Sequence, residues 1–520
     1  MTSVESNPLV CETPGSETRL QAVLRRLAKG TSIYILGTVL SKLLLLAIQV
    51  FLARQLRISG YGVYNLGFNT MILLQSVAMM GLDQAVLRYG ALYRGRGQLE
   101  FVKGTLLVSL VLGVVSSVLV AAALILVSPN VSIRVFSEPN LAPTLQLFAL
   151  ALPFYIVARI TGAFAQSHHD ILRMTVIQQI SQPAVYLPFV AALFFAGGGL
   201  RWAVGGFVVS TAFSAVVGMH SIRAVFPECF SSLRGRLHWR ELLRYSLALS
   251  AIAILYQVFW RAPSLLLGHF ASASEVGLFS AAATLASPPG FLSLIFAQPF
   301  MPMMVDLYEQ RNFRELDMLY RTVTRWTYIV VIPSFGFLVL FRGQILSLFG
   351  QDFKGGEGIL VTLGMAWMVY YAKGPVSALL DMTGHQAIDL ANLAGVLVLS
   401  LGLSLWWIPR AGAVGAGWAI SISILAWSFA ELIEAWILFR IPPVSKHLVQ
   451  IACLATLVFG VGFLMQDHVS VAAEAASVGA LYVALSFLFG VTPADRDLLR
   501  QGIRKLMLLL ARPAVVPAQD

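Results

Sequence analysis

The sequence is poor in charged residues. Only 12% of its 520 residues are Asp, Glu, Lys or Arg, about half the share found in a soluble globular protein, whereas 58% are hydrophobic. It has only three cysteines, Cys11, Cys229 and Cys453, which are too far apart to indicate a disulfide framework or a zinc site. No long polar segment separates its apolar runs, which leaves no room for a separate soluble catalytic domain. These absences favour a multi-pass membrane protein and argue against an enzyme.

The charge that is present is mainly basic, with a formal net charge of +11. Most lysines and arginines lie in short segments between apolar runs, a pattern that sets membrane topology and does not by itself indicate nucleic-acid binding. His168 and His169 adjoin Asp170, but no further ligand recurs there at metal-binding spacing. We therefore expect no nucleic-acid partner, no metal site and no catalytic residues.

Division at charges, prolines and glycine clusters gives apolar segments of about 20 residues or more, each long enough to cross a ~30 Å hydrocarbon core as a helix. The sequence predicts fourteen of them, at 30–52, 61–82, 102–127, 141–164, 173–196, 202–226, 242–268, 275–301, 324–349, 357–380, 387–408, 413–438, 447–466 and 471–491. The lysines and arginines concentrate on alternate connections, so we expect both termini, residues 1–29 and 492–520, to be cytoplasmic tails.

The chain also carries a weak internal repeat. A shift of 215 residues aligns Gly62 with Gly277 and Tyr64 with Phe279. This favours two six-helix lobes, residues 30–226 and 242–438, joined by a cytoplasmic linker at 227–241 and followed by two further helices within 439–491. Because six is an even number, the lobes share their topology and should be related by a pseudo-twofold axis along the membrane normal.

Four cations lie inside the predicted spans: Lys42, Arg159, Arg261 and Lys373. Each costs about 2.5 to 3.5 kcal/mol at the centre of a spanning helix on insertion scales. Two explanations are open. The cations pair with acids inside the spans, for which the candidates are Asp83, Asp381, Glu431 and Glu434, or they line a polar cavity between the lobes.

Helical periodicity places several of these cations on polar stripes. The first, second, seventh and eighth predicted helices carry coherent hydrophilic faces, and a cavity between them would suit an anion, phosphate above all, because Arg binds it bidentately. The candidate cavity residues are Lys42, Arg261, Gln257, Lys373, Arg159, Asn65, Asn69 and Gln49. Two acids near the end of the twelfth helix, Glu431 and Glu434, either take part in ion coupling or pair with Arg440.

Several motifs occur in a familiar order: FLARQL at the end of the first helix, GYGVYNL and GLDQAVLRY around the second, and LLDMTGHQAIDLANLAG in the second half. Together they resemble the polysaccharide flippases, of O-antigen or exopolysaccharide type, of the multidrug/oligosaccharidyl-lipid/polysaccharide (MOP) exporter superfamily. One departure is local. Arg57 stands where the commoner pattern has glycine after FLARQL.

The resemblance implies a transporter that flips an undecaprenyl-diphosphate-linked oligosaccharide across the bacterial inner membrane by alternating access. A central cationic cavity would bind the pyrophosphate and anionic sugars. It implies no cofactor, although protons, sodium ions or the membrane potential would drive the cycle. Expected partners are the lipid-linked substrate, membrane lipids, and a polymerase and glycosyltransferases of the same pathway, with the transporter itself a monomer. The alternatives are a cation-coupled multidrug exporter of the same superfamily and, from another class, a membrane polysaccharide polymerase or ligase.

Overall fold

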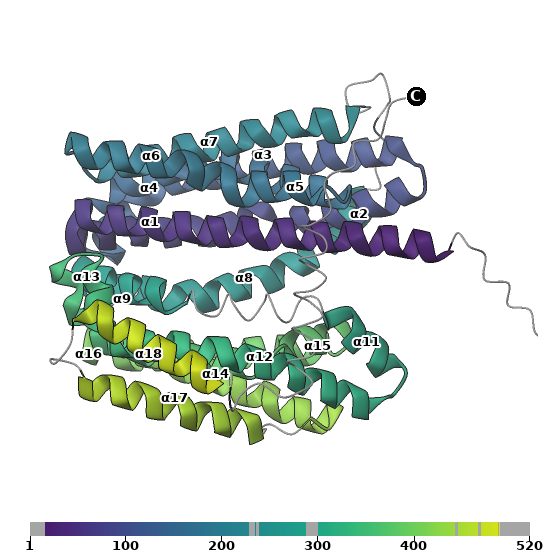
Figure 1. Ribbon diagram of the computed structural model, residues 1–520. Coiled ribbons are helices and arrows are strands. Elements are labelled where there is room, and N and C mark those ends of the chain that lie inside the picture. The colour runs from purple at the N-terminus through teal and green to yellow at the C-terminus, as the bar shows by residue number, and fades with distance from the viewer. Residues whose placement is uncertain are drawn as a thin grey trace, which may run out of the picture. The chain divides into compact units, whose positions relative to one another are not determined.

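The computed structural model of the protein describes residues 16–227, 235, 239–287, 300–441, 446–465, 470–486 and 488. Every regular element within these residues is a helix, as predicted from the sequence (Figure 1). The reason is physical, because hydrocarbon offers no hydrogen-bond partners and a helix satisfies its backbone groups internally. The chain divides into two compact units, Met1–Gly277 and Leu278–Asp520, called here the N-terminal and C-terminal units.

The N-terminal unit consists of long helices that run alongside one another (Figure 1). Its elements are α1 (Ser16–Met79), α2 (Leu82–Gly95), α3 (Leu99–Asn130), a π-helical turn (Val131–Val135), α4 (Leu141–Ser167), α5 (Ile171–Thr175), a second π-helical turn (Val176–Ile180), α6 (Ser181–Ala196), α7 (Leu200–Val225) and α8 (Trp239–Phe270). The repeat assigns α8 to the second lobe, but α8 packs within the N-terminal unit, against α1 and α2.

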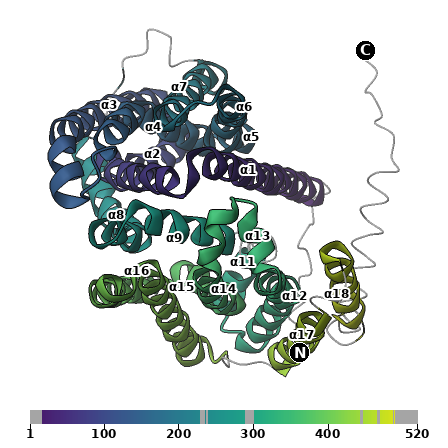
Figure 2. The same ribbon diagram turned by 90° about the vertical axis from the view of Figure 1, so that its left-hand side faces the viewer.

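The C-terminal unit is also helical. After α9 (Ala273–Ala286), which crosses the boundary between the units, its elements are α11 (Met301–Glu309), α12 (Phe313–Leu340), α13 (Arg342–Ser347), a 3₁₀ helix (Gln351–Gly356), α14 (Glu357–Ala372), α15 (Val376–Met382), α16 (Gln386–Phe439), α17 (Lys446–Met465) and α18 (Val471–Leu485). The last two helices, α17 and α18, lie next to each other, and α17 packs on α12 (Figure 2).

Eight of the described helices are long and apolar enough to cross a membrane, and a bent pair adds a ninth. Two of the eight each contain two predicted segments. The backbone of α1 breaks at Arg57 (φ 55°, ψ −179°), and that of α16 breaks at Gly412 (φ 55°, ψ −132°). With these breaks, each of the fourteen predicted segments corresponds to a described helix or helix pair. Parts of the eighth and fourteenth segments and the tails at 1–15 and 492–520 lie outside the described residues.

The tenth predicted segment, 357–380, is not one straight helix. It divides into α14 and α15, and the helix axis bends by 46° between them. The break falls at Lys373-Gly374-Pro375, where Gly374 has φ +74°. Proline removes a backbone donor and disfavours helical geometry in the preceding residue, so the Gly-Pro pair ends α14. Lys373 therefore lies at a helix terminus and not along a continuous polar stripe.

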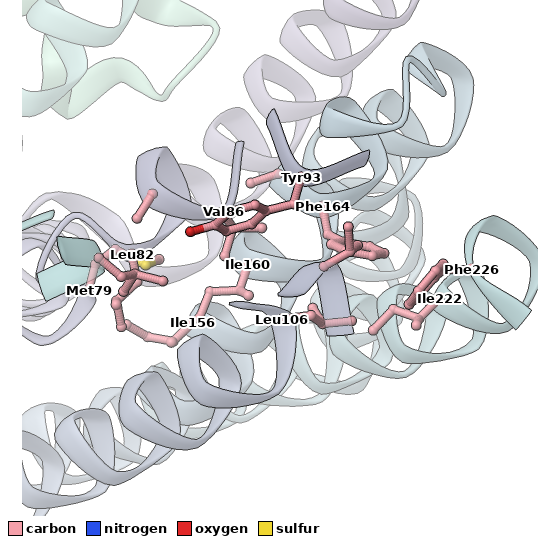
Figure 3. Close-up of a cluster of buried hydrophobic side chains, with 14 of the residues drawn as sticks. Met79, Leu82, Val86, Tyr93, Leu106, Ile156, Ile160, Phe164, Ile222 and Phe226 are labelled. Atoms are coloured by element: carbon pink, nitrogen blue, oxygen red, sulfur yellow. The ribbon is translucent and has the colours of Figure 1, made fainter. Parts of the chain in front are cut away.

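A buried apolar cluster holds the N-terminal unit together near the junction of α1 and α2 (Figure 3). Leu82 and Val86 of α2 pack with Leu106 of α3, Ile160 of α4 and Ile222 of α7, and each of them is at most 3% exposed. Leu242 of α8 belongs to the same cluster. The start of α8 is thus anchored on the N-terminal unit by hydrophobic packing.

Two glycines that the repeat aligns with each other contact each other's helices. A Cβ atom on Gly62 would lie 1.7 Å from the carbonyl oxygen of Ala273, and one on Gly277 would lie 2.2 Å from that of Ile58. The 215-residue shift maps Ile58 onto Ala273, so the two contacts are reciprocal. Only glycine allows the α1 and α9 backbones to approach this closely.

Candidate functional site

One group of polar contacts in the N-terminal unit includes Arg261 of α8. Its Nη1 donates to Oδ1 of Asn69 in α1 at 2.9 Å, and the amide nitrogen of Asn69 donates to Oγ of Ser264 at 3.0 Å. One asparagine side chain thus joins a cation and a hydroxyl one turn apart on α8. The sequence places Asn69 and Arg261 on two polar stripes, and the structure brings these two residues together.

Arg261 has hydrogen-bonding capacity to spare. Its Nε is buried and has no hydrogen-bond partner among the described residues, and its guanidinium carbon lies 5.9 Å from the centre of the Phe68 ring. Within the part of the chain that the structure describes, no carboxylate oxygen lies within 4.0 Å of its nitrogens. The side chain is half-buried.

The other candidates on α1 and α8 differ in their contacts. Gln49 accepts a hydrogen bond from the Tyr61 hydroxyl at 2.9 Å, and Asn65 donates to the Tyr61 carbonyl at 2.8 Å, so both are satisfied locally. Lys42 is exposed on α1 and makes no ion pair or hydrogen bond with the described residues, and Gln257 likewise makes no side-chain hydrogen bond there. Lys42 is therefore a second cation without a counter-ion among the described residues of this unit.

Arg159 of α4 has an acidic partner. Its Nη2 lies 3.2 Å from Oδ2 of Asp83 at the start of α2, and its Nη1 lies 3.4 Å from Oε1 of Gln178. The arginine side chain is 38% exposed, so the solvent weakens the pair. Asp83 is one of the acids that the sequence offered as a counter-ion, and Gln178 was not among the candidates.

In the C-terminal unit, Lys373 forms a buried ion pair with Glu431 of α16. The lysine and glutamate side chains are 2% and 0% exposed. The Ser377 hydroxyl also donates to the Glu431 carboxylate, at 2.9 Å from Oε2, and the ammonium lies 3.9 Å from the centre of the Tyr370 ring. The Tyr320 hydroxyl donates to the Lys373 carbonyl at the end of α14. Glu431 thus pairs with Lys373 instead of Arg440, and the two charges cancel.

Further acids surround this pair. The Asn392 amide donates to Oε2 of Glu434 at 2.8 Å, whereas Oδ1 of Asp389 is buried with no hydrogen-bond partner among the described residues. Sequence reasoning did not select Asp389 or Asn392. The signal for Asp389 was available, because it lies two residues inside the predicted helix at 387–408 and its insertion cost equals that of the acids that were considered.

The C-terminal unit also contains an apolar cavity of about 600 Å³, lined by α12, α14, α16 and α17. Phe335, Met365, Phe429 and Phe459 contribute to its wall. The wall contains two cations, and both have acidic partners: Lys373 pairs with Glu431, and Nε of Arg342 lies 3.0 Å from Oε2 of Glu357. The wall of the cavity is therefore mainly apolar, and the charge of each of its two cations is neutralised by an acid. It is within the size range of small-molecule sites.

Eight described helices that are long and apolar enough to cross a membrane, two of them with a broken backbone, define a multi-pass membrane protein. The chain belongs to a family described as polysaccharide biosynthesis protein, whose model matches residues 27–308. Its sequence is 20% identical over 502 residues to Stage V sporulation protein B of Bacillus subtilis strain 168, covering 90% of this chain and 96% of that protein. It is also 20% identical over 444 residues to the Lipid II flippase MurJ of the same organism, with coverages of 77% and 81%.

Solved structures show the fold. A structure of Lipid II flippase MurJ in an inward closed conformation superposes with a TM-score of 0.70 at 14% identity, covering 90% of this chain and 99% of that one. An inward-facing MATE-family multidrug resistance transporter gives a TM-score of 0.66 at 14% identity, with coverages of 77% and 94%. The fold is therefore that of the MOP superfamily, as the sequence motifs indicated.

Proposed function

We propose that the protein flips a lipid-diphosphate-linked oligosaccharide, on an undecaprenyl carrier, from the inner to the outer leaflet of the bacterial inner membrane. The observation that carries this proposal is the state of Arg261, which a neutral amide holds in place with no carboxylate nearby among the described residues. A cation in an apolar helix without a counter-ion is costly, so a substrate anion accounts for its presence. Membership of a polysaccharide biosynthesis family supports the same substrate class.

A diphosphate suits the arrangement around Arg261 better than a carboxylate or a single charge does. The guanidinium presents donors in a planar fork that matches phosphate oxygens, and its Nε has no hydrogen-bond partner among the described residues. Lys42 supplies a second charge in the same unit, with no ion-pair partner among the described residues, and Asn69 holds the guanidinium in one orientation. Arg159 would contribute less, because Asp83 already faces it.

The apolar cavity of the C-terminal unit supports a substrate with a lipid tail. Its aromatic and aliphatic wall suits an isoprenoid chain, and the pairing of Lys373 and Arg342 with acids removes the charge that would attract a headgroup. Arg261 and Lys42, which have no ion-pair partner among the described residues, belong to the N-terminal unit. We therefore assign headgroup binding to Arg261 and Lys42 of the N-terminal unit.

The proposed transport cycle also has an oligomeric state, a membrane orientation and an energy source. The protein works as a monomer with both termini in the cytoplasm, next to the glycosyltransferases and polymerase that make and consume its substrate. Protons, sodium ions or the membrane potential drive it; moving one net charge through 100 mV contributes about 2.3 kcal/mol. Glu434 and Asp389 are better candidates for ion coupling than Glu431, because Glu431 already has a cationic partner.

These acids are also the observation that favours the alternative, a cation-coupled exporter of cationic small molecules. Asp389 and Glu434 are carboxylates in α16, and such a protein needs acids that exchange cations. The two functions make opposite demands on Arg261, since a cation repels a cationic drug. A variant without this charge would then transport drugs at least as well as the wild type, but it would fail with a diphosphate lipid.

The test measures both binding and export. Arg261→Ala should weaken binding of undecaprenyl diphosphate to the purified protein by at least tenfold and abolish polymer export by cells that depend on the chain. Lys42→Ala should also weaken undecaprenyl diphosphate binding and reduce polymer export. Arg201→Ala, at the exposed start of α7, is the matched control and should retain both activities. Normal export by the Arg261 and Lys42 variants, singly and together, would contradict the proposal.

A further inference from the structure

α8 is buried in two separate stretches. Its buried residues are Leu242, Ser246 and Ser250 in the first stretch and Phe259, Pro263, Ser264, Leu267 and Gly268 in the second. None of the eight residues between them, 251–258, is buried. This interval is about 12 Å long, or about two helical turns. Different contacts therefore hold the two stretches, and one can separate from its partner while the other stays in place.

The first stretch lies against the start of α2, where few side chains hold it. Leu242 is the only fully buried apolar side chain within residues 239–250, and it packs in the cluster that contains Leu82. A second contact joins the two backbones. Gly81 has φ +69°, and a Cβ atom on it would lie 2.2 Å from the Ser246 carbonyl oxygen. Such a contact buries little apolar surface, so it adds little hydrophobic stabilisation.

A cation of α2 also contacts the first stretch. The guanidinium carbon of Arg88 lies 4.4 Å from the centre of the Tyr245 ring and 5.8 Å from that of the Tyr89 ring. The two rings meet edge to face, with their centres 5.7 Å apart and their planes at 85°. Arg88 is exposed, and a cation over an aromatic ring at an exposed site contributes a modest attraction. The residues of α2 that make these contacts all belong to the segment GLDQAVLRY.

The first stretch also covers part of the polar stripe of α8. At 100° per residue, Ser246 and Ser250 lie within about 60° of Arg261 around the helix axis. Their side chains are 0% and 6% exposed, although Arg261 itself is half-buried. The packing of α8 on the start of α2 therefore closes this stripe between Arg261 and the start of α8, which is its proposed cytoplasmic end.

We propose that residues 239–250 form a movable arm, which the contact of Arg88 with Tyr245 clasps onto α2. Release of the clasp uncovers Ser246 and Ser250 and opens a path along the stripe to Arg261, whose contact with Asn69 stays in place. Residues 251–258 act as the hinge. The role of the arm in transport rests on the proposed function, whereas the clasp itself depends on no substrate.

The first test measures the distance between α2 and the arm in the full-length protein in lipid nanodiscs. Spin labels replace Gln84 of α2 and Ala248 of α8, which are both exposed, and the native cysteines are replaced by serine. The wild type should show mainly one short distance by double electron–electron resonance. Arg88→Gln and Tyr245→Leu should each raise the population of longer distances about two- to fivefold, the factor expected for one exposed cation–π contact.

Conservative variants separate the clasp from ordinary packing. Tyr245→Phe keeps the ring and Arg88→Lys keeps the cation, so both should retain the wild-type distance. Labels at Ile133 and Phe270, near the hydrogen bond between His269 and the Val135 carbonyl, report the other end of α8 and should not change. An unchanged distribution in either Arg88→Gln or Tyr245→Leu would overturn the proposal. So would a Tyr245→Phe variant that opens as far as Tyr245→Leu.

The second test concerns the path. Ser250→Cys, in the protein without native cysteines, should react slowly with a membrane-impermeant maleimide added to inside-out vesicles, and adding Arg88→Gln should speed the reaction about two- to fivefold. An equal rate would show that the arm does not cover the stripe. Neither measurement uses the flipped lipid, so failure of the Arg261→Ala export test leaves the clasp intact. Failure of the clasp likewise leaves undecaprenyl diphosphate binding at Arg261 to be measured independently.

Discussion

Arg261 in the N-terminal unit and Lys373 in the C-terminal unit are cations in similarly apolar helices, but their surroundings differ. Asn69 holds Arg261 and leaves it without a counter-ion among the described residues, whereas Glu431 neutralises Lys373 in a pair that is at most 2% exposed. The first arrangement keeps a charge available for a ligand and the second removes it. The comparison teaches that a cation inside a span is a candidate for substrate binding only when its partners have been identified.

The comparison predicts that Lys373 contributes to the stability of the protein, whereas Arg261 contributes to substrate binding. Removing one partner of a buried ion pair leaves an uncompensated charge and typically costs about 3 to 5 kcal/mol. Glu431→Gln and Lys373→Ala should therefore each lower the apparent melting temperature of the purified protein strongly. The double variant Lys373→Met/Glu431→Leu should recover most of the loss, because it removes both charges together.

Arg261→Met is the matched variant in the other unit, and it should melt at or above the wild-type temperature while export is lost. If Glu431→Gln melts like the wild type, Lys373 does not depend on this pair. If Arg261→Met unfolds, the arginine is structural. Either result would contradict the assignment of Lys373 to stability and of Arg261 to substrate binding.

The next effect concerns the close contact between the backbones of α1 and α9 at Gly62 and Ala273. Gly62→Ala would place a Cβ atom 1.7 Å from the Ala273 carbonyl oxygen, so one backbone must move. We expect a loss of about 1 to 3 kcal/mol, the usual range for overpacking, together with weaker undecaprenyl diphosphate binding. Gly205→Ala in α7 is the control, since nothing lies within 4 Å of its added Cβ atom. Equal melting temperatures for Gly62→Ala and Gly205→Ala would contradict the close approach of the α1 and α9 backbones.

Much of the fold follows from the sequence, because apolar length and charge placement are local properties. The fourteen segments and the breaks near Arg57 and Gly412 are examples. The partners of the cations are not local: Lys373 and Glu431 are 58 residues apart, and Arg261 and Asn69 are 192 apart. Helical periodicity gives the face on which each residue lies, but not the neighbour that this face meets.

One sequence feature, the Gly374-Pro375 pair, predicts a helix end that the apolar run around it hides. Gly374-Pro375 marks the end of α14, but the apolar run from 357 to 380 predicts one continuous helix across it. The consequence is chemical, because the break frees the Lys373 carbonyl for the Tyr320 hydroxyl and directs its ammonium to Glu431. The axis bends by 46° at this break.

A single substitution should make the Arg261 site resemble the Lys373 site. Asn69→Asp places a carboxylate 2.9 Å from the guanidinium, and Ser264 can reverse its hydrogen bond to donate. The guanidinium then donates to an ionised acceptor instead of a neutral amide, which forms a partly buried ion pair with the arginine, so the melting temperature should rise. Binding of undecaprenyl diphosphate should fall, because the site loses its net charge. Asn65→Asp is the control, because the Asn65 amide donates to the Tyr61 carbonyl and has no cation as its partner among the described residues, so it should give no such stabilisation.

The smallest expected effect comes from the breaks in α1 and α16, which have the same φ of 55° but different residues. Gly412 adopts this conformation readily, whereas Arg57 has a Cβ atom and holds a conformation that costs about 1 to 3 kcal/mol for a non-glycine residue. Arg57→Gly should therefore stabilise the protein by about 1 kcal/mol once the added freedom of the unfolded chain is subtracted. The melting temperature at a fixed scan rate measures this gain, and Gly412→Ala should shift it in the opposite direction. A lower melting temperature for Arg57→Gly would mean that contacts of the arginine side chain outweigh its backbone strain, and the two breaks would then differ in more than the residue that forms them.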